Sequence, residues 1–210
     1  MLAPEFLARL GVFVAPGFID PETCGRLRAE MVAAGGSRAT VTVDLTDDRL
    51  DEDFRRTTIA GISRASSALV QDRLLGLAPV LEHRFDVALD GCEPPQFLLY
   101  REGDFIGRHS DGAREAEAPE WLRQRALSAV LFLNDQSDDR EEDGTFSGGA
   151  LTFFGLLADD PRGAAIGLPI RASAGLLVVF GTDLVHAVTP VVRGARCTAV
   201  TWYKARRAEV

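Results

Sequence analysis

Two histidines and one aspartate in this sequence could together hold a metal ion. His109 and Asp111 form a His-x-Asp motif, and His186 follows after a long intervening segment. Two imidazoles and one carboxylate can occupy one face of an octahedral metal and leave three positions free, which is the usual protein ligand set of a non-haem Fe(II) oxygenase. A spacing of two also places His109 and Asp111 on the same face of an extended segment. The pattern predicts an open iron site at these three residues.

Arg196 could supply the cation that such a site needs for a dicarboxylate co-substrate. We expect residues 189–194 to form the turn of a hairpin that brings Arg196 beside His186. A buried arginine needs an anionic partner, which could be an internal aspartate or the far carboxylate of a bound dicarboxylate. Arg193 is the competing candidate, but it precedes Gly194 in the turn and is expected to face solvent.

A His-x-Asp motif alone is weak evidence, because it often occurs by chance. The order of His-x-Asp, glycine pair, histidine and arginine is much more restrictive. The third histidine, His83, lies in a predicted helix without ligand spacing, so we interpret it as structural or exposed.

The first half of the chain is predicted to hold most of the helices. Asp20 is an N-cap followed by proline and opens a helix that ends at Gly35-Gly36. Apolar spacing predicts a helix over Ser63–Leu77, and we expect a second, short helix from Pro79 to about Phe85. Strands are predicted at Leu10–Ala15 and Arg38–Leu45.

The second half is predicted to be strands separated by turns. Helices early and strands late favour a mainly β fold, a β-sandwich or barrel with helices packed on one side, in which distant segments meet at one end. We expect one domain over residues 1–210, with a helical half at about 1–94 and a β core at about 95–205. The predicted strands of the core are Gln96–Tyr100, Leu127–Leu133, Ala150–Phe154, Leu176–Phe180 and Cys197–Tyr203.

Composition narrows the class of protein. The net charge of −8 disfavours nucleic-acid partners, and no apolar run is long enough to span a membrane. Three scattered cysteines without a Cys-x-x-Cys pair and an N-terminus unlike a signal peptide indicate the reducing cytoplasm. Two acidic segments, Asp44–Asp53 and Asp135–Asp143, are interpreted as solvated loops, or alternatively as the border of a site for a cationic substrate.

Several motifs together resemble the prolyl 4-hydroxylase branch of the 2-oxoglutarate/Fe(II) dioxygenases. The resemblance covers residues 95–205, and it is looser over the N-terminal half, through residues 17–20 and 56–58. Its motifs are Tyr100 to Asp111, Leu131-Phe-Leu-Asn134, Ser147 to Phe153, His186 to Pro190, Gly194-Ala-Arg196 and Thr201-Trp-Tyr203.

The resemblance implies a double-stranded β-helix, or jelly roll, with N-terminal helices supporting one sheet. It implies Fe(II) on His109, Asp111 and His186, with 2-oxoglutarate and O2 as co-substrates and ascorbate supporting activity. Arg196 would pair with the distal carboxylate of 2-oxoglutarate, and Asp111 implies hydroxylation, because halogenating relatives lack that carboxylate. Tyr100 would donate a hydrogen bond to the co-substrate, although a core aromatic role is nearly as good an interpretation.

The resemblance also suggests roles for residues around the co-substrate. Phe132 replaces a polar aromatic of some relatives, Gly148-Gly149 passes close to the cavity, and Trp202 packs beneath Arg196. Trp202 also stands where nucleic-acid demethylases of the superfamily carry a second arginine, which disfavours that activity.

Several functional hypotheses stay open at this point. The substrate could be a prolyl residue in a protein or peptide, or a free amino acid or small biosynthetic intermediate. A non-catalytic binding module or an iron or oxygen sensor is the alternative of another class. Substrate specificity is expected to lie in lid segments, for which Asp44–Ile59 and Asp135–Phe146 are the candidates.

Overall fold

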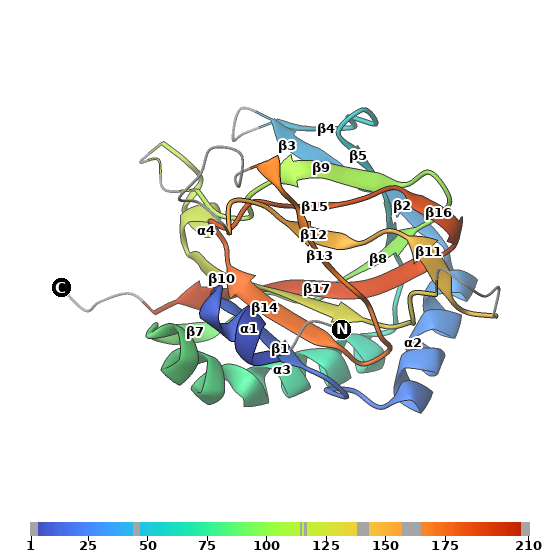
Figure 1. Cartoon of the computed structure of the whole chain (residues 1–210). Coiled ribbons are helices and arrows are strands. Elements are labelled where there is room, and N and C mark those ends of the chain that lie inside the picture. The colour runs from blue at the N-terminus through green and yellow to red at the C-terminus, as the bar shows by residue number, and fades with distance from the viewer. Residues whose placement is uncertain are drawn as a thin grey trace.

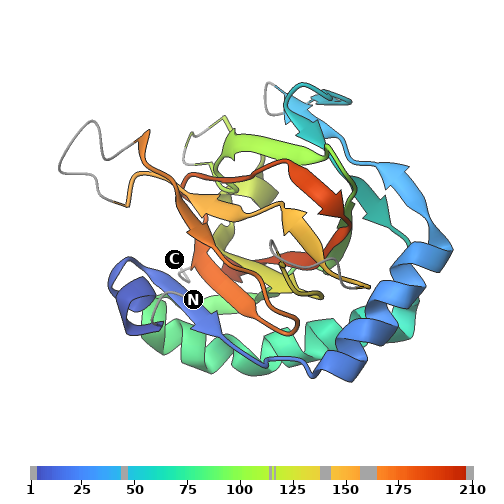
Figure 2. The same cartoon turned by 45° about the vertical axis from the view of Figure 1, so that its right-hand side comes forward.

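The computed structural model describes residues 4–43, 47–113, 115, 117–137, 143–156 and 165–206. Two antiparallel sheets face each other, and the long helices cover the outer side of the larger one (Figures 1 and 2). This arrangement is the jelly roll with helices supporting one sheet that the sequence predicts. The larger sheet has the order β1 (Val12–Ala15), β14 (Leu177–Gly181), β10 (Arg125–Phe132), β17 (Arg196–Ala205), β8 (Gln96–Tyr100), β6 (Thr58–Ala60) and β2 (Gly36–Arg38), with β7 (Leu89–Cys92) also paired to β17.

The smaller sheet carries the histidines of the predicted metal site. Its order is β13 (Leu168–Ile170), β12 (Leu151–Phe153), β15 (His186–Val188), β9 (Phe105–His109) and β5 (Arg55–Arg56). In the described part of the chain there are two further pairs of strands, β11 (Phe146–Gly148) with β16 (Val191–Gly194), and β3 (Val41–Val43) with β4 (Asp47–Arg49).

The side chains of β10 point alternately into two layers of the hydrophobic core, one on each face of the larger sheet. Leu127, Ala129 and Leu131 pack toward the helices, whereas Val130 and Phe132 face the space between the sheets. This alternation follows from the period of two in an extended strand. Because both faces are buried, the strand is apolar almost throughout, and a polar residue facing the interior is a sign of function.

The helices form where their caps and apolar faces predict. Asp20 caps α2 (Pro21–Ala34) by accepting a hydrogen bond from Thr23 N at 2.8 Å, and Gly35 follows the helix at φ 64°. The short helices α1 (Pro4–Arg9) and α4 (Glu120–Arg123) were not predicted.

The prediction of two helices separated at Pro79 is wrong. A single helix, α3, runs from Arg64 to Phe85 with Pro79 inside it. Proline removes one helical hydrogen bond. Leu74 and Leu81 nevertheless lie buried on either side of it against the larger sheet, so packing holds the two halves in one helix.

The connection from His186 to Arg196 also differs from the prediction, since it is not a hairpin. β15 belongs to the smaller sheet and β17 to the larger one, and the chain crosses between them through β16, which pairs with β11. His186 and Arg196 therefore approach the interior from facing sheets. The other late strands are confirmed to within two residues, whereas the predicted strand Arg38–Leu45 is divided between β2 and β3, with residues 44–46 outside the described part.

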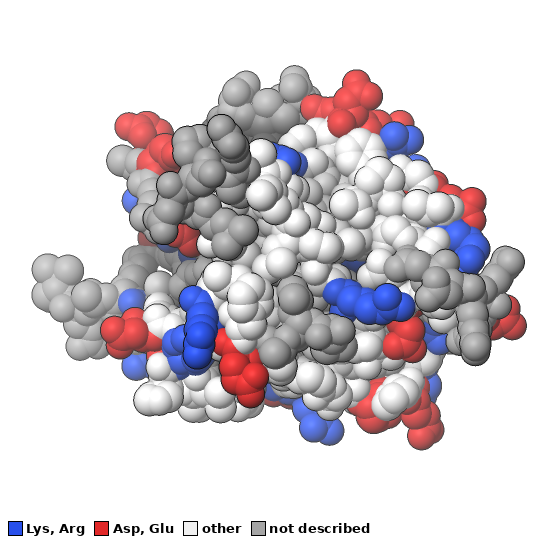
Figure 3. Space-filling model, viewed as in Figure 1, with Lys and Arg blue, Asp and Glu red and all other residues white. Residues whose placement is uncertain are grey.

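The surface carries charges of both signs. On the face shown in Figure 3, lysine and arginine side chains lie apart from one another among acidic ones, and the described residues form no continuous basic surface there. None of the helices in the described part of the chain has the length and apolar character needed to cross a bilayer.

Candidate metal and co-substrate site

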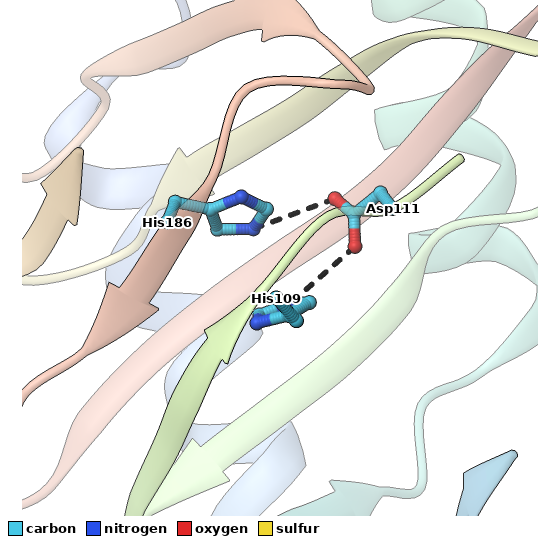
Figure 4. A group of neighbouring side chains, drawn as sticks. All are labelled: His109, Asp111 and His186. Carbon is cyan, nitrogen blue, oxygen red and sulfur yellow. Dashed lines mark ion pairs between the residues drawn. The ribbon is translucent and has the colours of Figure 1, made fainter. Parts of the chain in front are cut away.

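His109, Asp111 and His186 meet at one end of the space between the sheets. Both imidazoles point toward the Asp111 carboxylate (Figure 4), with His109 Nε2 at 3.4 Å from Oδ1 and His186 Nε2 at 3.5 Å from Oδ2. The three ligand atoms lie within 4.8 Å of one another, so they could hold one metal ion. As predicted, the residues stand at strand ends, since His109 closes β9, His186 opens β15, and Asp111 follows β9.

Backbone carbonyls fix the orientation of both imidazoles. His109 Nδ1 lies 2.9 Å from Gly107 O, and His186 Nδ1 lies 2.9 Å from Leu184 O. Because a carbonyl can only accept, each Nδ1 carries the proton and donates. Each Nε2 therefore keeps its lone pair for a metal, the arrangement that orients metal-binding histidines.

A β-bulge in β9 turns His109 into the site. His186 is paired with His109, but Val188 is paired with Ile106, so β9 has one residue more than β15 over this stretch. The extra residue lets Ile106 and His109 both line the interior, although they are three residues apart. In a regular strand, side chains three residues apart lie on opposite faces. The bulge therefore explains how His109 and Ile106 can both point inward.

Two glycines allow close approaches around the ligands. A Cβ on Gly107 would lie 3.0 Å from the Phe54 ring, and a Cβ on Gly112 would lie 2.6 Å from Thr182 Oγ1. Thr182 O also accepts the backbone N–H groups of Asp111 and Gly112 at 2.9 and 3.2 Å. The segment after β9 is therefore held against the residues that precede His186.

Ser128 of β10 donates a hydrogen bond to the Asp111 carboxylate. Its Oγ lies 2.7 Å from Oδ2, and the side chain is buried in the larger sheet. Burial acts to raise the pKa of Asp111. The neighbouring imidazoles of His109 and His186 and the hydrogen bond from the Ser128 hydroxyl together outweigh burial and hold that pKa far below its usual value. The carboxyl is therefore an anion ready to bind a cation.

His186 is favoured in its neutral form. Burial lowers the pKa of His186, and the opposing effect of the Asp111 charge is smaller. Neutral imidazole is the form that binds a metal, so the protonation states of both residues suit a metal site.

A cavity of about 70 Å³ extends from the three residues into the space between the sheets. Its walls are largely apolar, and Arg196 lies at its inner part, only 1% exposed. The guanidinium lies over the Tyr100 ring at 4.7 Å and over the Phe132 ring at 5.1 Å. The apolar lining is contributed by Leu98, Ile106, Ala129, Val130, Leu151, Val188 and Val200.

Arg196 has no carboxylate partner among the described residues. Its Nη1 donates to Thr198 Oγ1 at 3.4 Å, its guanidinium lies over the two rings, and its Nε is buried without a hydrogen-bond partner. Burial lowers the pKa of Arg196, because the charge is removed from water. Of the two partners predicted for this arginine, an internal aspartate is thus absent from the described residues, and the site fits an added dicarboxylate.

The neighbours of Arg196 correct one prediction and confirm another. Trp202 does not pack beneath Arg196 but beneath Arg125, whose guanidinium lies 3.5 Å from the Trp202 ring centre. The reason is distance, since six residues of strand span roughly 20 Å. Gly149 does pass close to the cavity, because its Cβ would lie 3.1 Å from Arg196 Cδ.

The remaining predicted residues are also located. Arg193 is half-buried on β16, donates to Ser137 O at 2.9 Å and does not line the cavity. His83 is exposed, as expected. Of the two candidate lid segments, the first contributes Arg55 to the cavity and the second contributes no described residue, with residues 44–46 and 138–142 outside the described part.

The geometry agrees with what comparison with known proteins shows. The model of the 2OG-Fe(II) oxygenase superfamily matches residues 95–204. The chain belongs to the 2OG-Fe(II) oxygenase superfamily. As a member, it is a 2-oxoglutarate-dependent dioxygenase, and its resemblance to the prolyl 4-hydroxylase branch is confirmed.

Relatives of this oxygenase are hydroxylases. The PKHD-type hydroxylase YbiX of Escherichia coli O17:K52:H18 (strain UMN026 / ExPEC) is 26% identical over 191 residues, which are 89% of this chain and 75% of the relative. A Pseudomonas putida prolyl-4-hydroxylase has a TM-score of 0.70 at 24% identity, covering 97% of each chain. A prolyl hydroxylase of Trichoplax adhaerens, in complex with a hypoxia inducible factor peptide fragment, has a TM-score of 0.66 at 17% identity, covering 95% of this chain and 86% of that one.

Two residues of this oxygenase site were missed at the sequence level. Ser128 had a signal, because it is a polar residue at an inward position of an otherwise apolar strand. Arg55 had none, because β5 is only two residues long and its pairing with β9 is visible only in the fold.

Proposed function

We propose that this oxygenase hydroxylates a C–H bond of a prolyl residue in a peptide or protein. We further propose that His109, Asp111 and His186 hold its Fe(II), and that Arg196 anchors 2-oxoglutarate. The observation that carries the proposal is that one cavity contains both the three converging residues and a buried cation that pairs with no carboxylate of the described residues.

The chemistry belongs to the iron, and the chain supplies positions and charges. Bound Fe(II) supplies the activation of O2 that couples decarboxylation of 2-oxoglutarate, giving succinate and CO2, to insertion of one oxygen atom into a C–H bond. Arg196 would pair with the distal carboxylate, an interaction strengthened by the apolar walls. Tyr100, whose ring contacts the guanidinium, could donate its hydroxyl proton to the same carboxylate. We also propose that ascorbate supports turnover and that the protein works in the cytoplasm.

The first experiment tests the metal ligands. Purified protein with Fe(II), ascorbate and 2-oxoglutarate is expected to form succinate, whereas His109→Ala and His186→Ala are expected to form none. His83→Ala is the matched control, because His83 is the third histidine and is exposed. Equal succinate formation by wild type and both ligand variants would contradict the proposed site.

The second experiment identifies the oxidised molecule. Proline-containing peptides and a cell extract are incubated with the enzyme and examined by mass spectrometry for a gain of one oxygen. Oxygen gain on proline in a peptide supports the proposal. Oxygen gain only on a free amino acid or small metabolite favours the alternative, a small-molecule hydroxylase.

A further inference from the structure

One charge in the catalytic cavity has no role in the function proposed above. The charged residues that line the cavity are Asp111, Arg196 and Arg55. The proposed function assigns Asp111 to the metal and Arg196 to the co-substrate. Arg55 is left as a cation in the same cavity that neither the proposed metal nor the proposed co-substrate uses.

The strand register explains why Arg55 faces inward. Arg55 is paired with Ile106, and Arg56 is paired with Phe105. Residues directly opposite each other in antiparallel strands have side chains on the same face of the sheet. Arg55 and Ile106 accordingly both line the cavity, while Arg56 is exposed and lies 4.9 Å from the Phe105 ring centre. The side chains of the two adjacent arginines thus lie on opposite faces of the smaller sheet.

Arg55 is only partly satisfied by the protein. Its Nη1 donates to Thr40 O at 3.3 Å, and its Nε is buried without a hydrogen-bond partner. Among the described residues, no carboxylate forms an ion pair with it. A guanidinium presents several donors in a planar fork that matches a carboxylate. The half-buried guanidinium therefore has donors and a full charge available for a bound anion.

The acids near the cavity do not offer an alternative. One interpretation of the sequence was that the two acidic segments border a site for a cationic substrate, but none of their described acids lines the cavity. Glu52 lies 3.8 Å from Arg38, and Asp51 accepts a hydrogen bond from Phe54 N at 3.2 Å. With iron bound, the described lining would be cationic on its substrate side.

We propose that Arg55 binds a carboxylate of the substrate, so that the enzyme acts on an acidic molecule. This inference rests on the proposed function, because it assumes that the substrate enters the cavity of His109, Asp111 and His186. The carboxylate could belong to a free acid or to an acidic side chain of a peptide, since the guanidinium would recognise both alike.

Two matched pairs of probes test the assignment. N-acetyl-L-proline and its amide differ in a free carboxylate, and acetyl-Glu-Pro-amide and acetyl-Gln-Pro-amide differ in a side-chain carboxylate. Binding to protein loaded with Mn(II) and 2-oxoglutarate is followed by tryptophan fluorescence, because Trp202 lines the cavity. At least one acidic probe is expected to bind roughly tenfold or more tightly than its neutral partner, as for one charge-assisted hydrogen bond.

Variants of the two adjacent arginines provide the control. Arg55→Met, which keeps the apolar stem, is expected to remove the preference for the acidic probe, and Arg55→Lys is expected to retain part of it. Arg56→Met is expected to leave the preference unchanged. Equal binding within both pairs, no binding by any of the four probes, or a preference that survives Arg55→Met would contradict the assignment. Slow succinate formation by the wild type without any probe tests the proposed function separately, since its absence would overturn that function and not the role of Arg55 alone.

Discussion

A single hydroxyl supports the carboxylate on which the proposed metal site depends. Asp111 follows the end of its strand, where the chain is less constrained than inside a sheet. Ser128, in contrast, stands in the middle of β10, whose neighbours on both sides are paired strands. Its hydrogen bond to Oδ2 therefore ties a proposed ligand on a loop to an interior strand of the larger sheet.

Replacement of Ser128 by alanine should weaken metal binding without removing it. The Asp111 carboxylate would lose a hydrogen bond of 2.7 Å, and loss of such supporting contacts typically costs about 10- to 100-fold in metal affinity. The dissociation constant of Mn(II) can be measured by electron paramagnetic resonance of the free ion. Ser128→Thr keeps the hydroxyl and should restore most of the affinity. Unchanged Mn(II) affinity in the alanine variant would show that Asp111 is positioned by its backbone alone.

At the residue scale, the residues that meet in the proposed metal site could be picked out from sequence, but the residues that support them could not. The residue types of the site and their order along the chain are typical of an iron and 2-oxoglutarate site and uncommon elsewhere. These residues are His109, Asp111, His186 and Arg196. The roles of Ser128 and Arg55 depend on which residue lies opposite which across a sheet. Such pairings join segments far apart in the chain, and a local pattern does not contain them.

At the scale of elements, the turn after β11 brings backbone against Arg196, the proposed co-substrate arginine. Gly149 has a φ of +58°, and a Cβ there would lie 3.0 Å from Val191 Cγ2 and 3.1 Å from Arg196 Cδ. Both the backbone conformation and the space are suited to glycine. The turn thus forms part of the wall behind the guanidinium.

Gly149→Ala should therefore affect both folding and co-substrate binding. We expect a loss of about 1 to 3 kcal/mol in the free energy of unfolding, from the left-handed backbone and the crowded Cβ. We also expect a several-fold rise in the KM for 2-oxoglutarate, because Arg196 must shift. Gly103→Ala is the matched control, since Gly103 has a φ of +80° but nothing within 4 Å of its Cβ. A KM that changes equally in both variants would mean that strain, and not contact with Arg196, is responsible.

Prediction of the elements succeeded where the signal was local. Asp20 caps its helix as expected, the helix predicted from Ser63 does begin next to it, and the late apolar strands lie close to their predicted bounds. The prediction failed at Pro79, where burial of the flanking leucines overrides the local preference of proline to end a helix. It failed again between His186 and Arg196, because a short turn sequence does not reveal whether the next strand joins the same sheet or the facing one.

At the scale of the whole molecule, the two faces of the larger sheet contact different things, the helices on one side and the cavity on the other. The outer face packs on α2 and α3 through a large apolar cluster, which includes Leu74, Leu131 and Tyr203. On the inner face, Arg196, Ser128 and the cavity stand in place of part of the apolar packing. Stability is thus concentrated on the helical side, and the strained and polar features of the site lie on the other.

Arg196 should lower the free energy of unfolding of the protein when no ligand is bound. A buried charge without an ionic partner is expensive, and even buried ion pairs, when replaced by apolar side chains of similar volume, often give proteins more stable by about 1 to 4 kcal/mol. Arg196→Met should accordingly raise the free energy of unfolding in urea when 2-oxoglutarate is absent. The same variant should lose the stabilisation that wild type gains from 2-oxoglutarate in the presence of Mn(II), about 2.7 kcal/mol at a ligand concentration 100 times Kd. Arg193→Met, at the arginine that does not line the cavity, should keep that gain. An Arg196→Met protein less stable than wild type would mean that the guanidinium is well paired without ligand, and an undiminished gain would mean that another group binds the distal carboxylate.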